Sequence, residues 1–212
     1  MTVGAALRSA AADFYRQSWR LFCLNAALSA LVVPIAVVGL WVPAVWALLV
    51  LTGPLAAALL HCAVVVTRTG QLALGEVVTG LRLHWRRGLV LGLVVAAGTA
   101  LGVHAISFYA GRGALVLAVL GVYVLIAFAA FQLVLWPLAI FESGVPARRV
   151  LGDAARALLQ RPLQALALTA ALLVVNAIGL AAAAVPFLTL TVAYSALAVA
   201  RFALPPTREA DT

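Results

Sequence analysis

The polar side chains best placed for chemistry in this sequence lie inside long apolar runs. Asn25, His61 and Gln132 each occupy such a run. Amides and imidazoles in lipid either hydrogen-bond another helix or line a cavity. These three residues are therefore expected to make intramembrane polar contacts. A helix-to-helix contact is the simpler interpretation, and the lining of one shared polar cavity is the alternative.

Motifs for familiar enzyme chemistry do not occur in the sequence. There is no Gly-x-x-x-x-Gly-Lys-Ser/Thr loop for nucleotide phosphates, no His-Glu-x-x-His for zinc and no Gly-x-Ser-x-Gly nucleophile turn. The six acidic residues fall outside the expected membrane crossings, where coupled transporters commonly place a carboxylate. We therefore predict no catalytic residue, no metal site and no cofactor, and we do not expect classical ion coupling.

The composition requires lipid as the solvent for most of the chain. Apolar residues make up 66% of the 212 residues and charged residues only 9%, too few to cover a water-soluble surface. Backbone groups in lipid must be paired within the segment, and the uncharged runs are too long for barrel strands. The sequence predicts an all-α, polytopic transmembrane helix bundle with cytoplasmic amphipathic interfacial helices.

Six crossings follow from the lengths of the uncharged runs, because a helix needs about 20 apolar residues to span a bilayer. Residues 1–20 are expected to form an interfacial helix, residues 21–204 a single bundle and residues 205–212 a short polar tail. The crossings are expected at 21–42, 44–66, 88–110, 114–140, 162–182 and 185–203. The last apolar run could instead span once, which would give five crossings.

The arginines set the expected orientation. Thirteen of the fourteen precede the first run, lie in the second and fourth gaps or follow the last run, and only Arg112 lies on the opposite side. Cytoplasmic loops are enriched in arginine, so both termini and the two large loops are predicted to be cytoplasmic. Five crossings would weaken the partition to 11 against 3, which favours six.

Each cytoplasmic gap contains an amphipathic stretch that leads into the next crossing, as interfacial helices do. The net charge of +8 is spread over these membrane-proximal gaps, which favours lipid over nucleic acid as a partner. The expected contacts for anionic lipid or a partner protein are Arg82, Arg86, Arg87, Arg148, Arg149 and Arg156.

The third crossing carries two small-residue motifs for close helix packing. Gly88-x-x-x-Gly92 and Gly98-x-x-x-Gly102 each place two glycines one turn apart. Another helix of the same chain is the expected partner, and a second copy of the chain in a homo-oligomer is the alternative.

Short motifs spread over nearly the whole chain, in a characteristic order, resemble the YesL family of bacterial membrane proteins, a domain of unknown function. They are Asn25, the helix start from Gly53-Pro54 to Ala58, the turn Thr69-Gly70-Gln71, the stretch Trp85-Arg86-Arg87-Gly88 and the exit from Pro137 to Glu142. The resemblance implies location in the bacterial inner membrane. Some relatives are encoded beside carbohydrate uptake systems, which implies an accessory role at a sugar ABC transporter.

Three functions are compatible with these features. A non-catalytic accessory or scaffold that contacts ABC transporter subunits is the first expectation, and a filled core would favour it. A small self-contained transporter or channel is the alternative, which a water-accessible cavity through the bundle would favour. The third is a membrane enzyme acting on lipid-linked substrates. A lateral opening beside Arg82, Arg86 and Arg87 would indicate a lipid site.

Overall fold

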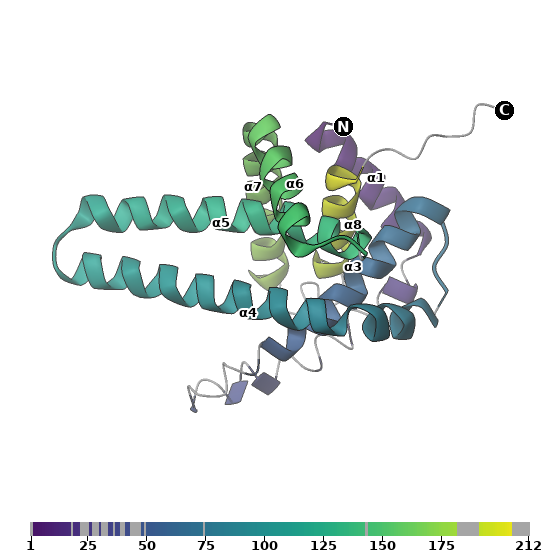
Figure 1. The fold of residues 1–212 in the computed structure, drawn as a ribbon, viewed down its shortest axis with the longest axis horizontal. Coiled ribbons are helices and arrows are strands. Elements are labelled where there is room, and N and C mark those ends of the chain that lie inside the picture. Colours follow the sequence, from purple (N-terminus) through teal and green to yellow (C-terminus); the bar gives the residue numbers. More distant parts are fainter. Residues whose placement is uncertain are drawn as a thin grey trace.

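The described elements of the chain are all helices. The computed structural model describes residues 2–17, 19–21, 26, 30, 34–35, 37–38, 41–42, 48, 50–73, 75–142, 144–181 and 191–204, and no strand occurs among them. The elements are α1 (Val3–Arg16), α3 (Thr52–Thr69), α4 (Gly75–Gly111), α5 (Leu115–Phe141), α6 (Ala147–Gln160), α7 (Pro162–Ala181) and α8 (Val192–Ala203) (Figure 1). The predicted all-α class is confirmed for this part of the chain.

Four of the described helices are long and apolar enough to cross a membrane: α3, α4, α5 and the segment Pro162–Gly179 of α7. They correspond to the second, third, fourth and fifth expected crossings. Helix α8 is apolar but has only 12 residues, fewer than the about 20 that a crossing needs. Most of the expected first crossing and the start of the sixth lie outside the described residues. The helices are compatible with membrane insertion, and four of the six expected crossings correspond to helices long and apolar enough to span a membrane.

Helix α4 begins earlier than the expected third crossing because it includes the amphipathic stretch before it. The helix runs unbroken for 37 residues, from Gly75 to Gly111. Gly88 lies inside α4 and does not end it. A helix end in an apolar setting would leave backbone N–H and C=O groups unpaired, which is costly. The stretch expected as an interfacial helix of its own in the second gap is therefore the first part of a helix that is long enough to span a membrane.

Helices α1 and α6, by contrast, are separate amphipathic elements. Helix α6 buries Val150 and Ala154 against residues of α5 and exposes Arg149 and Arg156. Helix α1 packs along α8, and Arg201 of α8 forms an ion pair with Asp13 of α1 at an Nη2 to Oδ2 distance of 2.6 Å. Helix α6 therefore packs on α5 and helix α1 on α8.

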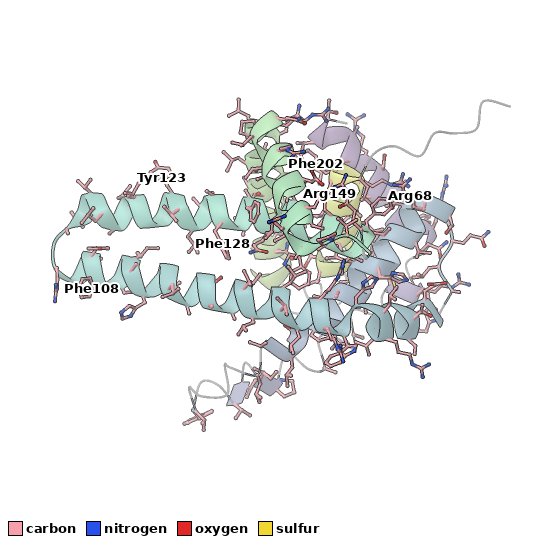
Figure 2. All side chains as sticks on the ribbon, viewed as in Figure 1. Arg68, Phe108, Tyr123, Phe128, Arg149 and Phe202 are labelled. Atoms are coloured by element: carbon pink, nitrogen blue, oxygen red, sulfur yellow. The ribbon has the colours of Figure 1, made fainter. Side chains whose placement is uncertain are left out.

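The hairpin of α4 and α5 projects well beyond the other helices, and Phe108 and Tyr123 lie on its projecting part (Figures 1 and 2). At its tip Gly113 has a φ of +75°, a left-handed conformation that favours glycine. The main core lies toward the other end of the molecule, where α1, α3 and α8 pack together. The fold thus consists of a packed base and a long apolar hairpin.

Glycines set the close helix contacts along α4. A Cβ on Gly88 would lie 2.7 Å from the carbonyl oxygen of Gly53 in α3. Farther along, a Cβ on Gly98 would lie 2.5 Å from Cζ of Phe128, and one on Gly102 would lie 2.9 Å from Cδ1 of Leu125, both in α5. The first half of α4 therefore packs on α3 and the second half on α5, both within the same chain.

Candidate functional site

Three titratable side chains form a hydrogen-bonded chain between α3 and the start of α4. His61 Nε2 lies 3.2 Å from Glu76 Oε2, and His84 Nε2 lies 3.3 Å from His61 Nδ1. Glu76, Gly80 and His84 follow one another at intervals of four residues and share a face of α4. A Cβ on Gly80 would lie 2.9 Å from the His61 ring, so glycine is needed for the imidazole to fit.

The Glu76–His61–His84 chain can order the imidazole tautomers at a helix contact. The His84 side chain belongs to a residue that is only 1% exposed, and its Nδ1 has no partner among the described residues. A neutral imidazole donates from one nitrogen and accepts at the other, so two rings and a carboxylate can form a continuous chain of hydrogen bonds. No group of three or more His, Cys, Asp or Glu side chains suited to a metal ion is found in the described part of the chain.

Sequence reasoning missed this chain because it placed Glu76 on a separate interfacial helix of the second gap and His61 in the preceding crossing, and it considered no contact between the two. The signal that could have found it is the regular spacing of Glu76, Gly80 and His84 on one helical face. Polar side chains on that face need a hydrogen-bond partner on a neighbouring helix, and His61 lies on the preceding helix.

Gln132 lies near the middle of the bundle, between two cavities. The residue is 7% exposed, and neither its amide oxygen nor its amide nitrogen has a partner among the described residues. A cavity of about 480 Å³ lies between α4, α5, α7 and α8, and one of about 310 Å³ lies between α3, α4, α5 and α8. Gln132 and Ser195 line both of them.

Three other polar side chains of the larger cavity are already engaged. Asn176 Nδ2 donates to Ser195 Oγ at 3.0 Å, and Ser195 Oγ donates to the Thr191 carbonyl oxygen at 2.7 Å. Thr169 Oγ1 donates to the Ala165 carbonyl oxygen at 2.8 Å. Gln132 is therefore the buried amide of this region whose hydrogen-bonding capacity is unused among the described residues.

Of the three residues expected to make intramembrane polar contacts, the two that the structure describes, His61 and Gln132, do not meet in one place. His61 contacts Glu76 and His84 and lines neither cavity beside Gln132. Asn25 lies outside the described residues. Helix α3 presents His61 toward the start of α4, whereas α5 presents Gln132 toward α7 and α8, so two separate polar sites result.

Arg87 links α4 to the end of α5 and to the following turn. Its Nη1 donates to the carbonyl oxygens of Ala139 at 2.8 Å and Glu142 at 3.0 Å, and its Nη2 donates to that of Val145 at 3.2 Å. Carbonyls at a helix C-terminus lack partners within the helix, and a cation is favourable there. Of the arginines expected to contact lipid, this one is occupied by the protein backbone.

The remaining arginines of that set are exposed: Arg82, Arg86, Arg148, Arg149 and Arg156. Arg149 lies on α6, where Figure 2 labels it. Arg156 Nη1 lies 3.2 Å from Asp153 Oδ1, one turn earlier on the same helix. The guanidinium carbon of Arg86 lies 5.2 Å from the ring centroid of Trp85. Exposed cations beside an aromatic residue are typical of a membrane interface.

Comparison with known proteins leaves the function to be argued from this geometry. No family model, no curated protein and no solved structure matches the chain. The resemblance to the YesL family stays a prediction.

Proposed function

We propose that this chain is a non-catalytic, multi-pass protein of the bacterial cytoplasmic membrane that acts as an accessory to a transport system. The observation that carries the proposal is the apolar surface of the α4–α5 hairpin. In the most apolar window of α4, with a mean hydropathy of 2.1, no residue is buried within the protein. A surface of this kind needs lipid or the helices of another membrane protein to cover it.

The dimensions of α4 support a spanning position for the hairpin. From Arg86 to Gly111 the helix rises about 38 Å at about 1.5 Å per residue, against about 40–45 Å for a bilayer with its headgroup regions. The guanidinium carbon of Arg112 lies 4.0 Å from the ring centroid of Phe108 at the far end, and Arg86 lies beside Trp85 at the near end. Cation and aromatic pairs at both ends suit the two membrane interfaces.

The hairpin also has the stiffness that a docking surface needs. Its two helices approach closely at Gly98, Gly102 and Gly121, so little movement is possible between them. Its outward side chains include Leu101 and Val116, which are 71% and 82% exposed. We propose that these faces lie against transmembrane helices of a partner, and the resemblance to the YesL family favours subunits of an ABC transporter as that partner.

Photo-crosslinking in the native host tests this proposal. A benzophenone amino acid replaces Val116 or Leu120 on the hairpin, and Tyr15 on α1 in the control, which is also exposed. We expect the hairpin positions, and not Tyr15, to crosslink to subunits of one transporter, identified by mass spectrometry. Crosslinks to lipid alone, or only to a second copy of this chain, would contradict the accessory role.

A self-contained transporter is the second candidate, and the cavities around Gln132 favour it. Two apolar cavities that share one unpaired amide resemble a site for a neutral solute more than a filled core does. Purified protein in liposomes should then release or accumulate neutral solutes, and Gln132→Leu should abolish that flux. If no tested solute crosses the liposome membrane and the hairpin crosslinks to a transporter, the self-contained transporter is excluded and the accessory role is supported.

A further inference from the structure

A third cavity, of about 360 Å³, opens between α4, α5 and α6. Helix α5 contributes Leu135 and Ala139, which are buried. Helix α4 contributes Val90 and Val94, whose residues are 60% and 43% exposed although they line the cavity. The cavity is thus a lateral groove with apolar walls that opens at the surface of the molecule, in the size range of about 300–1,000 Å³ typical of small-molecule sites.

Arginines lie at one end of this groove. Arg86, Val90 and Val94 are spaced four residues apart and form one stripe on α4, with the cation before the two apolar residues. The charge of Arg87 is held beside it by three backbone carbonyl oxygens. No acidic residue is among the described residues of the lining, and no ion pair of the described residues includes Arg86 or Arg87.

The start of α6 adds to the positive potential. Ala147, the first residue of α6, lines the groove, and the first turn contains no acidic residue. Pro146 at the N-cap makes no side-chain hydrogen bond to the turn. The first N–H groups of a helix and its dipole favour an anion at this position. Arg148 is exposed in the same turn.

We propose that the groove binds one anionic phospholipid of the cytoplasmic leaflet. An acyl chain lies along Val90, Val94 and Leu135, and the phosphate lies between Arg86 and the first turn of α6. This order matches the membrane, because the arginine distribution places Arg86 at the cytoplasmic interface and the valines deeper in the bilayer. The inference goes beyond the proposed function and does not depend on any protein partner.

The charge of the groove selects the headgroup. Arg86, Arg87 and the first residue of α6 line one groove, and the described lining contains no acidic residue. A lipid with a net negative charge is therefore bound most favourably. Phosphatidylglycerol meets this condition. Phosphatidylcholine carries the same phosphate but adds a quaternary ammonium group, which the neighbouring arginines repel.

Native mass spectrometry of the full-length protein tests the proposal. The protein is taken from nanodiscs that contain equal amounts of phosphatidylglycerol and phosphatidylcholine, and the retained lipids are counted. We expect one phosphatidylglycerol per chain. Because hydrogen bonds to charged groups are the strong ones, Arg86→Gln should lower the preference for phosphatidylglycerol about tenfold, and Arg86→Lys should keep most of it.

Two further variants separate the groove from general charge effects. Arg161→Gln removes an exposed arginine at the C-terminal end of α6 that does not line the groove, and it should leave lipid retention unchanged. Val90→Trp fills the groove and should reduce retention of both lipids. Unfolding temperatures of all variants check that each one is folded. Equal retention of the two lipids by the unaltered protein, equal effects of Arg161→Gln and Arg86→Gln, or undiminished retention by Val90→Trp would each overturn the proposal.

Discussion

Among single residues, the buried polar side chains differ in whether the protein satisfies them. Asn176 is paired with Ser195, and His61 is paired with Glu76. Gln132 has no partner for either amide atom among the described residues. An unsatisfied buried polar group costs about 1–3 kcal/mol, so retention of this glutamine is costly unless a bound molecule satisfies it.

Replacement of Gln132 by leucine therefore should not destabilise the purified protein. We expect the free energy of unfolding of Gln132→Leu to rise by about 1 kcal/mol, because the substitution removes the unpaired amide at similar volume. Asn176→Leu is the matched control. It should lower the free energy of unfolding, since the hydrogen bond to Ser195 is lost. Unfolding in detergent measures both. A lower stability of Gln132→Leu would show that the amide has a partner in the native protein.

Adjacent arginines should behave differently because only one of them is bound to the backbone. Arg87→Met removes three hydrogen bonds to carbonyl oxygens of Ala139, Glu142 and Val145. Hydrogen bonds of charged groups contribute about 1.5–3 kcal/mol each, and we expect a total loss of about 3 kcal/mol because the bonds share one side chain. Arg86→Met in lipid-free detergent should change stability by less than about 0.5 kcal/mol. Similar losses for the two variants would mean that Arg87 does not hold the helix end.

At the scale of the elements, glycine positions decide how closely the helices approach. Gly53, Gly88 and Gly92 bring the backbones of α3 and α4 together. Added side chains there would meet backbone atoms, which cannot rotate away as the end of a flexible side chain can. The α3–α4 contact also aligns His61 with Glu76 and His84, so this packing and the polar chain depend on each other.

Gly88→Ala should consequently disrupt the α3–α4 contact. Its Cβ would lie 2.7 Å from the Gly53 carbonyl oxygen and 2.8 Å from Pro54 Cα, and we expect a loss of about 1–3 kcal/mol from this overpacking. Gly152→Ala is the control, since a Cβ on this α6 residue meets nothing within 4 Å. That variant should gain about 0.5–1 kcal/mol from helix propensity. Thermal unfolding compares the two, and an equal gain in both would exclude tight packing at Gly88.

For the whole molecule, the packed base and the hairpin tip are predicted to lie on opposite sides of the membrane. The arginine-rich segments gather at the base, and Arg112 is at the tip. The inverted orientation would place the arginine-rich segments on the outer side of the membrane, where arginine is disfavoured. The orientation therefore gives a direct test of the topology.

Labelling of intact cells with a membrane-impermeant maleimide measures this orientation. In a variant with Cys23 and Cys62 replaced by alanine, Arg112→Cys should react in intact cells. Thr2→Cys, on the N-terminal side of α1, should react only after the membrane is permeabilised. Reaction of Thr2→Cys in intact cells, or protection of Arg112→Cys, would reverse or exclude the proposed topology.

The helical class and the compatibility with a membrane could be predicted from the sequence alone. Both depend on properties summed over many residues: the lengths of uncharged runs and the share of apolar side chains. A sum of this kind tolerates errors at single positions. The separate amphipathic helix α6 was predictable for a similar reason, because the alternation of Val150 and Ala154 with Arg149 and Arg156 is a local pattern.

Only the tertiary structure decided the polar sites. Arg87 bonds to carbonyl oxygens 52 to 58 residues away, and the face that Gln132 occupies became a cavity wall through contacts with α7 and α8. The close approach of α3 and α4 at Gly53 and Gly88 is likewise a contact between separate helices. A sequence specifies the faces of each helix, but the pairing of those faces depends on the relative positions and rotations of helices that are far apart in the chain.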